Sequence, residues 1–153
     1  LERSATWGNA ENYLTELYGV TEMDRFTRDS NALIIWSGCL EDKNLKVETP
    51  VYSLDILPTL SNLFGLNYDS RLLVGRDVFS DTEPLVRWPE YSWKTDKGTY
   101  DSGSRTFTPA EGVEVDDSYV DRIKAIVSNK ISYSREVQNL KYFQVLSDFL
   151  NGK

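Results

Sequence analysis

Residues 50–66 read PVYSLDILPTLSNLFGL, a pattern that predicts one short helix. Its apolar residues recur at intervals of three and four, as on one face of a helix over residues 54–64: Leu54, Leu57, Leu60, Leu63 and Phe64. Ser53 is placed to cap the free amide groups at the start of the helix, and Gly65 is a stop signal. Pro58 falls early enough to be tolerated or to kink the first turns.

An apolar run upstream of this helix predicts a strand buried on both faces. Residues 32–36 read ALIIW, which is too short for a typical helix and rich in residues that favour strands, and the run ends at Ser37 and Gly38. Further upstream, residues 9–17 predict a short amphipathic helix that stops at Gly19. Strand, loop and helix in this order are typical of an α/β protein.

The middle of the chain predicts a small antiparallel hairpin between irregular connections. Three consecutive segments make the hairpin: Tyr91–Thr95, a turn at residues 96–98, and Thr99–Tyr100. A short strand is predicted before it at Leu85–Trp88. Residues 66–81 and 101–112 are rich in turn-forming residues and predict little regular structure.

The carboxyl-terminal part predicts two helices. From Asp116 onward an apolar stripe recurs at helical spacing: Tyr119, Val120, Ile123, Ile126, Val127 and Ile131. A break near Ser132–Ser134 or at Asn139 precedes a last helix. That helix packs through five apolar residues: Leu140, Phe143, Leu146, Phe149 and Leu150.

Composition limits the class of protein. The 153 residues, 40% of them hydrophobic, suffice for one compact unit over residues 1–153. The net charge of −7 disfavours attraction to phosphates, so nucleic acid is not expected as a partner. The longest apolar runs are far shorter than the roughly 20 residues of a membrane-spanning helix, so we expect the chain itself to be soluble.

The residue types available for catalysis are few, because the chain has no histidine and only one cysteine, Cys39. Histidine is the commonest general base and transition-metal ligand, and it activates serine and cysteine nucleophiles. One cysteine can form neither an internal disulfide nor a cysteine-based zinc site. A site of carboxylates and lysine remains possible, as in glycosidases, so catalysis is disfavoured without being excluded.

Two polar features could form a site, and each also has a structural explanation. Asp55 lies in the first turn of the predicted helix, where a carboxylate suits the free amide groups, and no further ligand lies nearby at metal-site spacing. Arg71, Arg76 and Asp77 surround Gly75 and suit a phosphate or carboxylate clamp. Internal ion pairing that fixes the loop is the interpretation we favour.

Aromatic and acidic residues form two further candidate groups. Five aromatic residues suit a surface for sugar rings or a partner or, as we favour, cross-strand packing: Trp88, Tyr91, Trp93, Tyr100 and Phe107. Four acidic residues could hold a hard cation: Glu111, Glu114, Asp116 and Asp117. They lack the loop spacing of a calcium site, so we interpret them as a solvated turn before a helix. Cys39 is interpreted as a small packed residue.

Residues 50–66 resemble the late segment of sulfatase-type proteins, above all lipoteichoic acid synthase-like proteins. Residues 31–38, 68–77 and 92–96 resemble the same branch in the same order, so that the resemblance extends from about Tyr13 to Phe143. It implies an α/β fold, the carboxy-terminal part of an alkaline phosphatase-like α/β/α sandwich, with a small antiparallel hairpin and terminal helices.

The resemblance also implies an activity and a place for a parent protein. Proteins of this family transfer glycerol phosphate from phosphatidylglycerol to a growing teichoic acid polymer through a phosphorylated threonine, with Mn²⁺ or a similar divalent metal. The catalytic domain is displayed on the extracellular face of a bacterial membrane beneath membrane-spanning helices. A divalent cation would lower the pKa of the threonine and offset the charge that develops on phosphate.

Matching residue by residue carries over no catalytic or metal-binding position, and the substrate-binding residues stay unknown. Neither the family's threonine motif nor its Asp-His metal pair occurs here, and Thr59 belongs to the helix signature rather than to the nucleophile motif. The resemblance implies that both lie earlier, in an amino-terminal half of the same domain that would be this chain's partner. Some relatives have a histidine near Val47–Pro50 where this sequence has none, so the substrate and the transfer reaction stay open.

Three functions follow from these observations. The first is the carboxy-terminal scaffold portion of a metal-dependent phosphoglycerol transferase, inactive by itself. The second is a noncatalytic module in which the Trp88–Phe107 region binds cell-wall glycan or another protein. The third is part of a sulfate or phosphate ester hydrolase. A scaffold portion would expose a strand edge and apolar surface, so self-association is expected.

Overall fold

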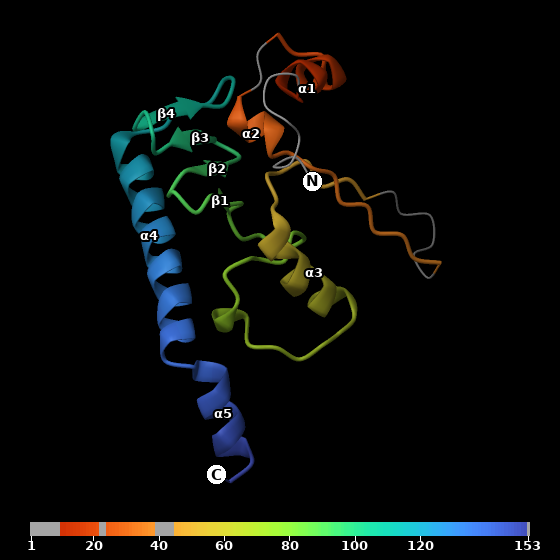
Figure 1. Ribbon diagram of the computed structural model, residues 1–153, viewed down its shortest axis with the longest axis vertical. Helices are drawn as coiled ribbons and strands as arrows, with labels where there is room; N and C mark the ends of the chain where they lie inside the picture. Colours follow the sequence, from red (N-terminus) through yellow and green to blue (C-terminus); the bar gives the residue numbers. More distant parts are fainter. Residues whose placement is uncertain (1–9, 22–23, 39–44, 153) are drawn as a thin grey trace. The chain divides into compact units, whose positions relative to one another are not determined.

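The computed structural model describes residues 10–21, 24–38 and 45–152 of the chain (Figure 1). Contacts within the chain group the residues into two compact units, 1–44 and 45–153. Among the residues the structure describes, no helix has both the length and the apolar content needed to cross a membrane.

In the described part of the first unit there are two helices, α1 (Ala10–Tyr18) and α2 (Arg25–Arg28). Helix α1 confirms the helix predicted at residues 9–17, and Gly19 follows it in a left-handed conformation with φ 66°. The carboxylate of Asp24 caps α2 by accepting hydrogen bonds from the amides of Phe26 and Thr27.

The predicted buried strand in this unit is wrong. Residues 32–36 are extended, but they belong to no strand, and the side chains of Ile34 and Trp36 are each 87% exposed. A strand needs a neighbour with which to share backbone hydrogen bonds, and the only sheet in the described part of the chain consists of four strands from the second unit. The sequence pattern indicates that this segment is apolar, but it does not indicate whether a neighbouring strand is present.

The second unit has a mixed α/β architecture with a four-stranded antiparallel sheet in the order β1-β2-β3-β4. The strands are consecutive along the chain: β1 (Val86–Arg87), β2 (Trp93–Thr95), β3 (Gly98–Asp101) and β4 (Thr106–Pro109). The predicted hairpin is confirmed, since Thr95 pairs with Gly98 across a two-residue turn. The fourth strand was not expected, because Gly103 and Pro109 obscure its short period; it pairs along all four residues of β3.

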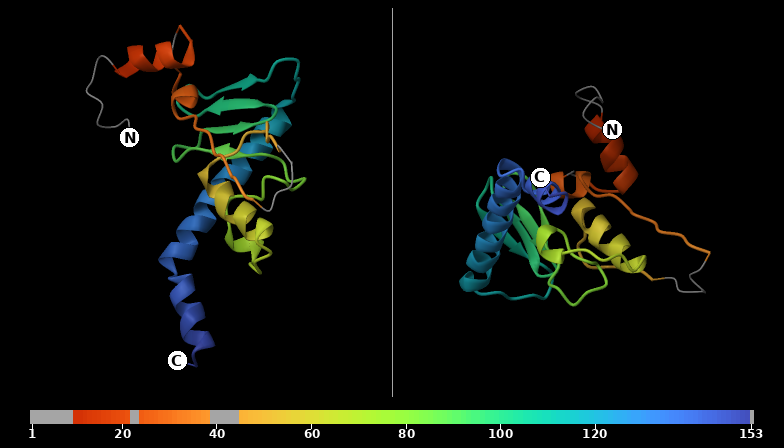
Figure 2. Two further views of the ribbon diagram at one scale, coloured as in Figure 1. Left: turned by 90° about the vertical axis from the view of Figure 1, so that its right-hand side faces the viewer. Right: turned by 90° about the horizontal axis from the view of Figure 1, so that it is seen from below.

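One long helix covers a face of this sheet (Figure 2). Helix α4 (Asp117–Asn139) begins at the acidic residues that predicted its start, and it runs unbroken to the second of the two predicted break points. Lys141 then adopts a left-handed conformation, with φ 48°, before α5 (Tyr142–Leu150). The core between α4 and the sheet consists of five buried residues: Trp93, Tyr100, Tyr119, Ile123 and Val127.

The remaining elements of the second unit are the helix predicted over residues 54–64 and two short 3₁₀ turns near it. A 3₁₀ turn, η2 (Ser53–Asp55), leads into α3 (Ile56–Leu63), and a second 3₁₀ turn, η3 (Ser70–Leu72), lies in the connection to the sheet. The helix predicted over residues 54–64 is therefore confirmed with a tighter first turn. The predicted cap is wrong. The capping side chain is Asp55 rather than Ser53, because the carboxylate of Asp55 accepts a hydrogen bond from the amide of Tyr52.

Candidate functional site

Asp55 is the centre of a polar clamp between the start of α3 and the connection that follows η3. The residue is 2% exposed. It accepts a hydrogen bond from the amide of Tyr52 at 3.2 Å and another from the amide of Arg76 at 2.8 Å. Burial raises the pKa of Asp55, although these two amides and the charges of Arg76 and Lys130 act in the opposite direction.

Thr59 closes the same clamp one helical turn later. Its hydroxyl donates to the carbonyl oxygen of Asp55 at 2.6 Å and accepts from the amide of Val78 at 3.1 Å. Gly75 makes this approach possible, because a Cβ at that position would collide with the backbone carbonyl of Leu54. Asp55 and Thr59 are therefore occupied in holding residues 75–78 against α3.

The two arginines and the aspartate around Gly75 do not converge on a shared anion site. Arg71 pairs with Asp69 at 2.6 Å, and its hydrogen bond to Asp69 lowers the pKa of that carboxyl to about 2. Arg76 donates to the backbone oxygens of Asp77 and Val78. The carboxylate of Asp77 accepts from the side-chain amide of Asn62 at 2.6 Å. The predicted ion pairing is confirmed for Arg71, whereas Arg76 and Asp77 fix the loop through hydrogen bonds to backbone oxygens and neutral side chains.

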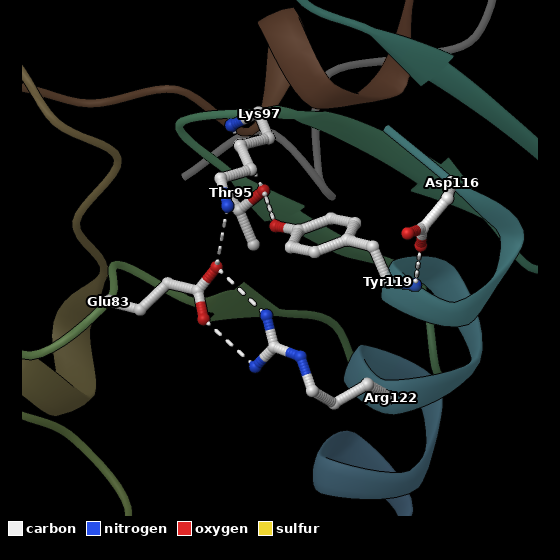
Figure 3. Close-up of polar contacts among 6 residues, drawn as sticks. All are labelled: Glu83, Thr95, Lys97, Asp116, Tyr119 and Arg122. Carbon is white, nitrogen blue, oxygen red and sulfur yellow. Dashed lines mark hydrogen bonds and ion pairs between the residues drawn. The ribbon is translucent and has the colours of Figure 1, made fainter. Parts of the chain in front are cut away.

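Tyr119 joins the sheet to α4 through a second polar group (Figure 3). Its hydroxyl lies 2.8 Å from the hydroxyl of Thr95, which also accepts the amide of Lys97 at 3.1 Å. Burial raises the pKa of Tyr119, and the nearby carboxylate of Glu83 raises it further, against the effect of the Thr95 hydrogen bond. The phenol therefore stays neutral, and its hydroxyl forms a hydrogen bond in the core.

Glu83 binds two basic side chains beside Tyr119 (Figure 3). Arg122 on α4 reaches both carboxylate oxygens, at 3.1 and 3.4 Å, and the ammonium of Lys97 lies 3.9 Å from one of them. The same three residues line an open polar cavity of about 430 Å³ that Arg76 also borders. Three basic and three acidic residues line this cavity, so its formal charges balance and it has no net charge to attract an ion.

The aromatic residues divide between core and surface. Trp93 is 0% exposed and stacks on Tyr100 with ring centroids 5.5 Å apart, while Phe107 packs against the same indole at 5.5 Å. Tyr91 is half exposed, with φ 71° in the turn before β2. Cross-strand packing, the favoured interpretation, is confirmed for the three packed residues, and a ligand-binding surface cannot use the buried face of Trp93.

The acidic group before α4 is confirmed as a helix start. Asp116 accepts hydrogen bonds from the hydroxyl of Ser118 at 2.7 Å and the amide of Tyr119 at 2.8 Å, and these contacts lower its pKa. Asp117, Glu111 and Glu114 are exposed. Within residues 10–21, 24–38 and 45–152, no three acidic, cysteine or histidine side chains gather as metal ligands. Cys39 lies outside the described residues.

Comparisons of the chain with models of protein families, with curated proteins and with solved structures find no match. The geometry of the chain itself therefore carries the functional argument.

Sequence reasoning missed the partners in both polar groups. Asp55 was noticed because of its place in the helix, but the amide that it holds lies 21 residues further along. Glu83 and Arg122 are 39 residues apart, and no local pattern joins them. The one available signal was the combination of a buried helix start with Gly75, since glycine often marks a close backbone approach.

Proposed function

We propose that this chain is the carboxy-terminal scaffold portion of a metal-dependent phosphoglycerol transferase of the lipoteichoic acid synthase-like kind, and that it is inactive by itself. The observation that carries the proposal is the clamp between two segments of the resemblance. Asp55 and Thr59 in the first segment hold the amides of Arg76, in the second segment, and of Val78, directly after it. These two polar residues of the resemblance thus hold the backbone in place, which fits a structural role rather than transfer chemistry.

The surface of α3 and α5 supports a role within a larger domain. Two adjacent pairs of large apolar residues are exposed, one at the end of α3 and one at the end of α5: Leu63 with Phe64, and Phe149 with Leu150. Apolar residues that are exposed side by side on a folded unit fit a contact with further protein. In the proposed parent, this surface and the extended residues 32–36 meet the remainder of an α/β/α sandwich.

The proposed division of labour assigns the chemistry to the parent. Phosphatidylglycerol and a teichoic acid polymer would be its substrates, on the extracellular face of a bacterial membrane. The described residues do not fit a Mn²⁺ site, because no three of their acidic side chains gather as ligands and because Asp55, Asp116 and Glu83 already hold backbone amides or pair with a basic side chain. No step of a metal-assisted reaction is therefore assigned to them.

Substitution of Thr59 in the whole parent protein tests the scaffold role. Thr59→Val keeps the shape of the side chain but removes the hydroxyl that accepts from Val78, whereas Thr59→Ser keeps the hydroxyl. We expect Thr59→Val to lower transfer from phosphatidylglycerol only in proportion to the loss of folded protein, and Thr59→Ser to transfer normally. A Thr59→Val protein that is fully folded but devoid of transfer, or a phosphate found on Thr59 by mass spectrometry, would contradict the proposal.

A further inference from the structure

A second cavity lies on the other side of the Asp55 clamp and differs from the polar one in its chemistry. It has a volume of about 360 Å³ and is bordered by the start of α3, the connection after η3, the second half of α4 and the start of α5. Its walls are mostly aliphatic and aromatic, with contributions from Leu54, Leu57, Leu73, Val137 and Phe143. The volume lies near the lower end of the range for small-molecule sites, which are mainly apolar with a few polar groups.

Arg87 supplies the only charge among the residues that line this cavity. Its Nε is buried and has no hydrogen-bond partner within the described part of the chain. The guanidinium is a neighbour of the phenol of Tyr52, whose pKa is raised by burial and by Asp55 but lowered by the charge of Arg87 and by a hydrogen bond from its side chain. A phenol is a neutral partner, so the positive charge of Arg87 is not cancelled there.

A second cation lies behind the same wall. The ammonium of Lys130 donates to the carbonyl oxygen of Val74, a residue that lines the cavity, at 2.6 Å. Burial lowers the pKa of Lys130, and the charge of Arg87 lowers it further, while Asp55 opposes both effects. Arg87 and Lys130 therefore both place positive charge at this end of the cavity, Asp55 offsets part of the charge of Lys130, and the local potential is positive.

We propose that this cavity binds a small amphiphile with a carboxylate head and an unbranched alkyl tail. The guanidinium of Arg87 receives the carboxylate, because Arg87 is the charged residue of the lining and its planar fork matches two carboxylate oxygens. The tail lies along Leu54, Leu57 and Phe143, where its burial removes apolar surface from water. This site is independent of the proposed transferase role, since it uses neither the clamp hydroxyl nor any parent residue.

Isothermal titration of the purified chain with decanoate tests the site, at concentrations well below those at which decanoate forms micelles. Decyltrimethylammonium has a tail of the same length with the opposite charge. We expect decanoate to bind one site per chain and the cation to bind at least about tenfold more weakly, because it loses the charge-assisted hydrogen bonds to Arg87. Absence of decanoate binding, or equal binding of the two probes, overturns the proposal.

Two pairs of variants locate the site. Arg87→Met keeps most of the apolar stem and is expected to weaken decanoate binding at least about tenfold, whereas the exposed Arg105→Met should bind as the wild type does. On α3, Leu57→Gln lies in the cavity wall and should weaken binding, whereas Leu63→Gln lies on the same helix outside the wall. Unchanged binding by Arg87→Met overturns the proposal. If Arg87→Met does not fold, two other comparisons test the proposal. One compares decanoate with decyltrimethylammonium on the wild-type chain, and the other compares Leu57→Gln with Leu63→Gln.

Discussion

The sheet with α4 and the segment around α3 belong to the same unit but are held together differently. Between the sheet and α4 lies an apolar core, in which Trp93 is 0% exposed and packs against three aromatic rings. Around α3 the buried side chains are mostly polar: Asp55, Thr59 and Ser61 are buried together with Pro58, while Leu57 and Phe64 of the same segment are exposed. One region gains its stability from apolar burial and the other from hydrogen bonds to backbone amides.

The difference explains how the chain keeps apolar side chains exposed. A helix that packs its leucines inward has none left for a partner, whereas α3 is fixed by Asp55 and Thr59 and keeps Leu57 and Leu63 exposed. Backbone amides that lie inside a protein require an acceptor, so the clamp also satisfies the amides of residues 76 and 78. The experiments that follow test each half of this comparison.

Removing the centre of the apolar core should have the largest effect. Trp93→Ala empties a fully buried site, and we expect the free energy of unfolding to fall by about 3–5 kcal/mol. Urea denaturation followed by circular dichroism measures this loss. Trp36→Ala is the matched control, because that side chain is 87% exposed and should change stability by at most about 0.5 kcal/mol. Equal losses in the two variants would refute the assignment of the core.

Blocking the close approach in the clamp should have the next largest effect. In Gly75→Ala the added methyl collides with the carbonyl of Leu54, and we expect a loss of about 1–3 kcal/mol, as for other overpacked sites. Gly38→Ala is the control, since a Cβ there meets only a tryptophan carbon at 3.8 Å. Urea denaturation again compares the two. A Gly75→Ala chain as stable as the wild type would show that residues 75–78 do not need their observed position.

The ion pair beside Tyr119 should matter least in neutral buffer. The Arg122 and Glu83 side chains are 49% and 33% exposed, and solvent-screened pairs of this kind contribute about 0–1 kcal/mol. Arg122→Met should therefore lower the free energy of unfolding by less than about 1 kcal/mol, and the difference should shrink in high salt. A larger, salt-independent loss would indicate that the guanidinium packs on the Tyr119 ring, 5.1 Å away, more than it pairs with Glu83.

Acid should act on the two regions with opposite sign. Ser118 and the amide of Tyr119 lower the pKa of Asp116, so its stabilising effect is present above the usual pKa and is lost as the pH falls. Burial raises the pKa of Asp55, so its ionisation reduces stability as the pH rises through the raised value.

Unfolding titrations of two variants from neutral pH to about pH 2 compare these effects. The advantage of the wild type over Asp116→Asn should shrink on acidification, and its advantage over Asp55→Asn should grow. Changes of the same sign in both variants would contradict the assigned environments of the two carboxylates.

Local pattern was enough for most of the secondary structure. The periodicity of the apolar residues located α1, α3 and α4, and the turn chemistry of residues 96–98 located the hairpin between β2 and β3. Residues 32–36 failed because an apolar run predicts burial only when a neighbour is present to bury it. Strand β4 was missed because four residues between a glycine-containing turn and a proline are too few to show a period.

The long-range polar contacts could not be predicted from the sequence. The clamp joins Asp55 to Arg76 and Thr59 to Val78, and both acceptors receive backbone amides, which every residue type except proline offers. No side-chain pattern can therefore identify the partner. The sequence also could not predict that Arg87 lines an apolar cavity, because the apolar residues around it come from four separate segments.

Turnover of phosphatidylglycerol by the purified 153-residue chain, with Mn²⁺ supplied, is the sharpest test of whether this chain is a scaffold that is inactive by itself. Because Asp55, Thr59 and Asp116 are all occupied in holding backbone amides, we predict no release of diacylglycerol above the rate of a protein-free control. Steady release of diacylglycerol that depends on the chain and on the metal would contradict the account.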